Sequence, residues 1–90
     1  MWEDETSYSR GETVRTPRTW VNRWPDIAVT VHRLHGVDGA WFLTCYPASF
    51  EQFDLRTDDL DEAKREGVRL VRDRLVKMLA FVDRMADSSP

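Results

Sequence analysis

The side chains with the clearest capacity for chemistry are two histidines and one cysteine. His32 and His35 are three residues apart, and Cys45 is the only cysteine among 90 residues. In an extended strand, residues i and i+3 point to opposite faces, so these imidazoles do not form a ready zinc site. His32 could act as a base for the Cys45 thiol if the two faced each other across a hairpin, although a lone buried cysteine is more typical of a structural role. A small enzyme built on Cys45 and His32 therefore stays as a second alternative.

A run of acids from Asp54 to Glu62 is the other cluster of ligand-like side chains. It lacks the alternating oxygen ligands and the sixth-position glycine of an EF-hand loop, which favours a solvated helix start over a calcium site. The sequence also lacks a glycine-rich phosphate loop, a G-x-S-x-G motif and an H-E-x-x-H motif. We expect a non-enzymatic protein with no cofactor and no metal centre.

An aromatic and basic segment offers contacts of a different kind. Trp20 and Trp24 are four residues apart, so they either cap the core or form part of a protein interface. Arginine interleaved with aromatic rings can also bind nucleic acid. The arginines of this segment are Arg10, Arg15, Arg18 and Arg23. The chain has 13 basic and 16 acidic residues, a net charge of −3, which disfavours nucleic-acid binding and leaves it as the first alternative.

The segments that must position these residues predict an α+β fold. Residues 1–19 are polar and show no periodicity, so we expect a flexible arm, or an arm that orders on a partner. Alternation of β-branched and aromatic residues then predicts an antiparallel sheet. Its first two strands are joined by a turn at Asp38-Gly39, and Pro47 ends the second. The expected strands are at about 26–34, 40–46 and 50–55, with a candidate fourth at 19–24.

The last third of the chain predicts one long helix at about 58–86, within a single domain of residues 20–87 and before a tail at 88–90. Thr57, Asp58 and Asp59 are candidate N-caps, Asp59 also has Glu62 at the capping-box spacing, and acids fill the first turns. The apolar residues form a stripe about half the circumference wide. Gly67 in the middle of this stripe indicates close approach to the sheet, which we place over Trp41.

The predicted helix is longer than the predicted sheet. Residues 58–86 span about 43 Å, whereas strands of seven or eight residues span about 25 Å. The sheet therefore covers the helix to about residue 74, and the remainder protrudes with many apolar side chains. The large ones are Leu75, Met78, Leu79, Phe81, Val82 and Met85. They could fold back on Trp20 and Trp24, dock on another protein or a membrane surface, or pair with a second copy, and we favour the homodimer.

From Ile27 to about Val71 the order of elements resembles the N-terminal domain of HicB-type antitoxins. The resemblance is carried by the Asp38-Gly39-Ala40-Trp41 turn, by Pro47 after the second strand, and by the helix start "TDDLDEAKREG". The glycine-rich third strand of that family is missing, and no separate DNA-binding segment follows the helix. The resemblance implies a dimer that inhibits a partner protein without regulating DNA, and it carries over no catalytic residues.

The sequence thus predicts a small module that self-associates and acts by stoichiometric binding to a partner protein, as an inhibitor or regulator. We find no signal peptide and no apolar run near the ~20 residues of a membrane span, so we expect a cytoplasmic protein that does not contact membranes. A short, arginine-rich, cysteine-poor chain is also typical of accessory or phage-borne genes.

Overall fold

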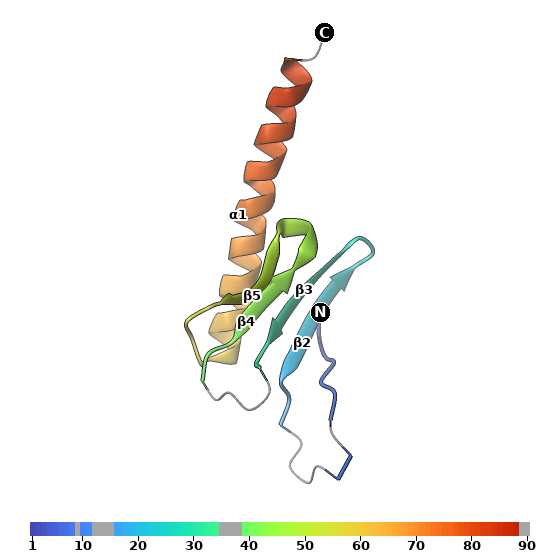
Figure 1. Cartoon of the computed structure of the whole chain (residues 1–90), viewed down its shortest axis with the longest axis vertical. Coiled ribbons are helices and arrows are strands. Elements are labelled where there is room, and N and C mark those ends of the chain that lie inside the picture. The colour runs from blue at the N-terminus through green and yellow to red at the C-terminus, as the bar shows by residue number, and fades with distance from the viewer. Residues whose placement is uncertain (9, 12–15, 35–38, 89–90) are drawn as a thin grey trace.

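A computed structural model describes residues 1–8, 10–11, 16–34 and 39–88 of the chain, and shows one antiparallel sheet with a single long helix on one of its faces (Figure 1). The five strands lie in the order β1-β2-β3-β4-β5, so each pairs with its neighbour in sequence. The strands are β1 (Trp2–Asp4), β2 (Thr19–Trp24), β3 (Ile27–His32), β4 (Phe42–Cys45) and β5 (Phe50–Asp54). A 3-10 turn η1 (Tyr46–Ala48) follows β4, and α1 (Leu60–Asp87) follows β5.

The predicted α+β class is confirmed, but the sheet has five strands where we predicted three and a candidate fourth. The candidate at 19–24 is β2, with the predicted bounds. The fifth strand is β1, formed by residues 2–4, which we expected in a flexible arm. Trp2 pairs with Asn22 and Asp4 with Trp20, and the Trp2 ring packs against the core. Three residues are too few to show periodicity, so only pairing with a distant strand defines β1.

The alternation in β3 and β4 places the core as predicted. Val31 pairs with Leu43, and both are completely buried on the face that α1 covers. Strand β4 ends at Cys45, and Pro47 lies in the 3-10 turn η1 that follows it directly. Asp38 of the predicted turn lies outside the described residues, but Gly39 has a φ of 102°, a conformation that favours glycine.

The helix begins at Leu60, two residues after the predicted start, and Asp59 is its N-cap and accepts a hydrogen bond from the Glu62 N–H at 3.1 Å. Ala63, Gly67 and Val71 are its buried residues, spaced four apart along one face. A Cβ on Gly67 would lie 3.4 Å from side-chain methyls of both Leu43 and Val31. The predicted close approach at Gly67 therefore exists, but over Val31 and Leu43 and not over Trp41.

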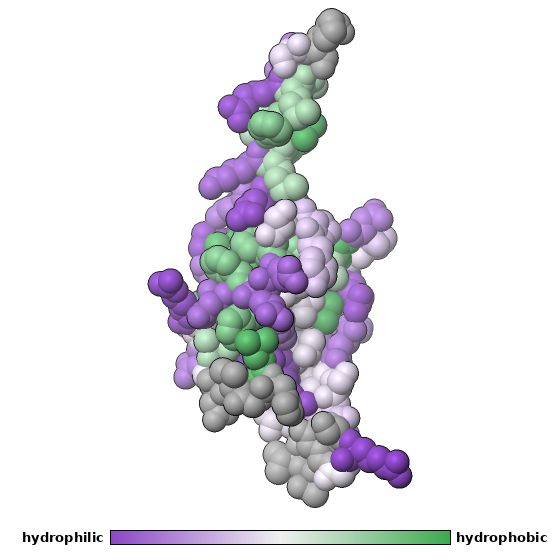
Figure 2. All heavy atoms as spheres, in the orientation of Figure 1, coloured by the Kyte–Doolittle hydropathy of each residue, from purple (hydrophilic) through white to green (hydrophobic). Residues whose placement is uncertain are grey.

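The helix extends well past the sheet. Its 28 residues correspond to about 42 Å, whereas the six residues of β2 or β3 correspond to about 20 Å. The molecule measures 62 × 25 × 20 Å, and its radius of gyration of 16.0 Å exceeds the roughly 12 Å of a compact 90-residue domain. The end of α1 protrudes beyond the strands in Figure 1, and Figure 2 shows hydrophobic atoms along it.

Candidate protein interface

The candidate enzymatic pair is separated by the sheet. Cys45 is buried in the core on the helix side, whereas His32 lies on the other face, where its Nε2 is 2.9 Å from the Thr44 hydroxyl. Neighbouring residues such as Thr44 and Cys45 point to opposite faces of a strand, so the register keeps the imidazole away from the thiol. Burial raises the pKa of the Cys45 thiol and lowers the pKa of His32, both of which disfavour the charged forms. His35 lies outside the described residues.

The acidic run from β5 to the helix start serves local structure. The Asp54 carboxylate accepts a hydrogen bond from the Arg56 N–H at 2.7 Å, in a turn where Arg56 has a φ of 57°. The Thr57 hydroxyl donates to Glu62 at 3.2 Å and accepts from the Asp59 N–H at 3.2 Å. Among the described residues, no group of three His, Cys, Asp or Glu side chains is placed to hold a metal ion.

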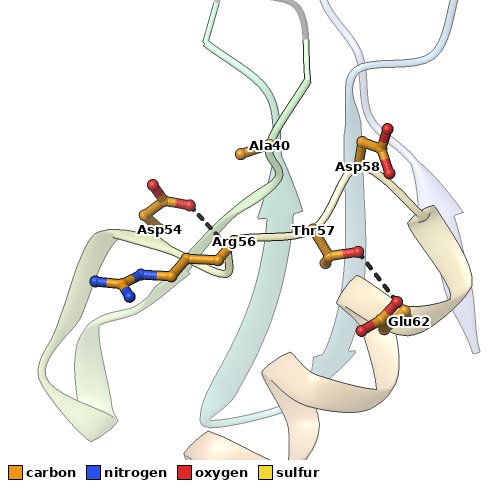
Figure 3. A pocket seen from close by; sticks show the side chains of 6 residues that line it. All are labelled: Ala40, Asp54, Arg56, Thr57, Asp58 and Glu62. Carbon is orange, nitrogen blue, oxygen red and sulfur yellow. Dashed lines mark hydrogen bonds between the residues drawn. The ribbon is translucent and has the colours of Figure 1, made fainter.

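These residues border an open hollow of about 630 Å³ at the start of α1. Figure 3 shows that Asp54 and Arg56 extend to one side of the hollow, while Thr57 and Glu62 face each other on the helix side. The side chains of Asp54, Thr57 and Glu62 hold the turn and the helix start, and the Asp58 carbonyl accepts hydrogen bonds from the Arg33 and Trp41 side chains, each at 3.1 Å. The hollow is therefore a consequence of the connection between β5 and α1.

Arg23 of the predicted nucleic-acid segment does not share a surface with the two Trp rings. Arg23 pairs with Glu5, at 2.6 and 3.0 Å between side-chain atoms, and strand alternation places it on the face opposite Trp20 and Trp24. The Arg18 guanidinium donates to the Ser7 carbonyl at 2.8 Å. Arg10 is exposed, and Arg15 lies outside the described residues. The sheet thus separates Arg23 from both Trp rings, while the Arg18 guanidinium lies 5.5 Å from the centre of the Tyr8 ring.

The six large apolar residues predicted for the interface all lie on the part of α1 that extends past the sheet. We refer to residues 75–87 as the overhang. The six keep between 37% and 61% of their surfaces exposed, and none belongs to the core cluster. They are Leu75, Met78, Leu79, Phe81, Val82 and Met85. The sheet thus leaves uncovered the most apolar part of the helix.

The change from anchored to uncovered helix occurs at Arg74. Its guanidinium donates to the Ala48 carbonyl at 3.2 Å and lies 4.5 Å from the centre of the Phe50 ring. A cation on the apolar stripe is therefore explained by an acceptor and an aromatic face at the end of the sheet. From Leu75 onward every described residue of α1 is exposed.

Trp20 and Trp24 are not joined to the overhang. Trp20 is half-buried beneath Lys64, whose ammonium lies 4.4 Å from the centre of the ring, and Trp24 is 75% exposed at the end of β2. In Figure 1, α1 continues straight beyond the sheet, so in this structure its end does not fold back on β2.

The sequence did not reveal a groove of about 410 Å³ beside the covered half of α1. Trp2 and Val68 provide its apolar surface, and four cations surround it. The ammonium of Lys64 lies 5.6 Å from the centre of the Trp2 ring. The cations are Lys64, Arg65, Arg69 and Arg72. The i, i+4, i+7 spacing of the three arginines predicts one basic flank, but only the position of β1 turns this flank into a groove.

Comparison with models of protein families, with curated proteins and with solved structures gives no match for the chain. In the described part of the chain, no helix combines the length and the apolarity needed to cross a membrane.

Proposed function

We propose that this protein is a non-enzymatic protein-binding module that self-associates through the overhang and acts by stoichiometric binding to a partner protein. The observation that carries the proposal is the run of exposed apolar side chains on residues 75–87, beyond the end of the sheet. A monomer would leave this surface in water, where large apolar patches are rare unless they bind something. A homodimer needs only one self-complementary patch, which a helix face readily supplies.

The partner-binding half of the proposal is supported by the arrangement of the fold and by the absence of a catalytic constellation in the described residues. The order of hairpin, third strand and helix resembles HicB-type antitoxins, and an inhibitor of that kind acts by occupying a partner. One face of the sheet has no helix over it, so a surface remains for a partner while α1 is engaged in the dimer (Figure 1).

Sedimentation equilibrium of two adjacent variants tests the self-association. Leu79 is 61% exposed and lies within the apolar stripe, whereas Ala80 lies on the opposite side of α1. Two copies of Leu79 per dimer represent about 2–4 kcal/mol of apolar burial, so L79D should raise the dissociation constant at least about 20-fold. A80D adds the same charge one residue away and should remain dimeric. A wild-type chain that is monomeric at high concentration would contradict the proposal.

A further inference from the structure

We infer that the groove between Trp2 and α1 receives the overhang of a second copy, so that two α1 helices lie antiparallel and each groove holds the other chain's helix end. This inference rests on the proposed self-association and specifies its geometry. The groove combines apolar contacts from Trp2 and Val68 with a basic rim. It therefore suits an apolar helix that carries acids on one flank.

The apolar stripe of α1 runs from the groove to the overhang, and Arg72, seven residues before Leu79, is a charged residue on the same side of the helix. Val68, Leu75 and Val82 are seven residues apart, and Leu79 and Ala86 complete the same side of the helix. A seven-residue repeat keeps such residues facing one partner helix along the whole length. The floor of the groove and the contact surface of the overhang are thus two ends of one seam.

The distances along α1 from the groove and from the overhang agree with a two-fold axis near residue 77. Val68 and Ala86 then lie equally far from the axis, about 14 Å each at 1.5 Å per residue. The antiparallel pairing places Ala86 of one copy over Val68 of the other, and Leu75 opposite Leu79. The overhang reaches the groove of the partner without bending.

The charges favour this direction over a parallel pair. Arg65, Arg72 and Asp83 lie on the same flank of the seam, within about 60° of Val68 at 100° per residue. An antiparallel two-fold axis brings this flank of one helix against the same flank of the other, with the order of residues reversed. Asp83 then lies beside Arg72, and Asp87 beside Arg65, of the second copy. A parallel pair would instead set this flank against the opposite flank of the second helix, where Val71, Met78 and Val82 offer no charge to pair with Arg72 or Asp83.

The cations on this flank are accessible for such pairing. The Arg72 side chain is 75% exposed, and its guanidinium lies 3.6 Å from Asp73. Arg65 is exposed as well. Arg69 is already engaged by Glu66 and by Asp73, and its hydrogen bonds lower the pKa of Glu66. The overhang of a second copy would thus meet Arg72 and Arg65, while Arg69 keeps its neighbours.

Disulfide cross-linking of the full chain tests the geometry. In a C45A background, which circular dichroism should show to be folded, V68C/A86C should form a covalent dimer under mild oxidation. V68C alone and A86C alone should not, because a disulfide needs Cα atoms within about 7 Å. The two positions are 18 residues apart on one helix, so a bond within one chain is excluded. Adding L79D to V68C/A86C is the matched control and should abolish the link by dissociating the dimer.

The possible results separate this inference from the proposal on which it rests. Cross-linking by V68C alone, without the 68–86 link, would establish a parallel pair and overturn the inference while self-association stands. A sedimenting dimer with none of these links would show that the overhang docks elsewhere, which also overturns it. A chain that is monomeric throughout would refute the self-association itself.

A charge exchange gives an independent measurement. R72E and D83R should each raise the dissociation constant of the dimer about tenfold, and the double variant R72E/D83R should recover most of the loss. Dissociation constants that are unchanged in both single variants, or losses that simply add in the double variant, would contradict the pairing of these two residues across the seam.

Discussion

Replacing Gly67 by larger residues measures how closely α1 lies on the sheet. We expect G67A to stabilise the monomer by about 0.5–1 kcal/mol and G67V to destabilise it by about 1–3 kcal/mol. The two substitutions differ by two methyl groups, but they should have opposite signs because the space above the sheet admits one carbon and no more.

The opposite effects expected for G67A and G67V follow from the distances around position 67. A Cβ at position 67 would lie 3.4 Å from methyl groups of Leu43 and of Val31. This separation is at the short end of ordinary carbon contact, so alanine keeps most of the helix propensity that glycine lacks. Valine adds two further carbons against neighbours that are fully buried and have no room to retreat.

Urea unfolding followed by tryptophan fluorescence is a suitable assay, since Trp41 is buried in the core. The L79D background removes the dependence on protein concentration that dimerisation would introduce. Arg65 is exposed to solvent and lies on the half of α1 that packs on the sheet. The pair R65A and R65G therefore measures the difference in helix propensity between alanine and glycine without a packing contribution. Subtracting this difference from that between G67A and wild type isolates the packing contribution.

The reasoning would be refuted if G67A lost more than about 1 kcal/mol while R65A and R65G differed by the usual amount of about 1 kcal/mol. The helix would then lie nearer to Val31 and Leu43 than the structure places it. A stable G67V would refute it in the opposite direction, because α1 would have room to move away from the sheet.

The half-buried His32 and the buried Cys45 give two further predictions. Burial lowers the pKa of His32 below its ordinary value of 6.5, so protonation opposes folding: stability should be complete above pH 6.5 and fall as the pH drops from there towards the lowered pKa. Urea unfolding between pH 7.5 and pH 5 should show this slope in wild type and lose most of it in H32Q, and an unchanged slope in H32Q would contradict the argument. Cys45 is 1% exposed and burial raises the pKa of its thiol, so labelling by a thiol reagent at pH 8 should require unfolding and accelerate in parallel with urea-induced unfolding; rapid labelling of the native protein would contradict its place in the core.

The elements that were predictable from the sequence are those specified by local patterns. The alternation around Val31 and Leu43 locates the two central strands, and the Asp59 cap locates the start of the helix, because each signal lies within a few residues. The exposed overhang followed from comparing two lengths. None of these three predictions depends on which strands pair.

The features that the sequence did not reveal depend on pairing over distance. Strand β1 exists because Trp2 pairs with Asn22, and the groove exists because this pairing brings Trp2 beside Lys64. Lys64 lies on the apolar stripe of α1, where its ammonium is 5.6 Å from the centre of the Trp2 ring and 4.4 Å from the centre of the Trp20 ring. The approach of Gly67 was predictable, but its neighbours were not, because the angle of the helix across the strands depends on the whole sheet.

The edges of the sheet add a reason to place self-association on the helix. An exposed edge strand can pair with another chain, but β1 has only three residues and carries Glu3 and Asp4. The opposite edge, β5, is bent at Gln52, where φ is 47°, and carries Glu51 and Asp54. Joining two sheets at either edge would therefore bring carboxylates together along a short or bent strand. Because both edges are short or bent and acidic, neither competes with the apolar face of α1 as the proposed surface for self-association.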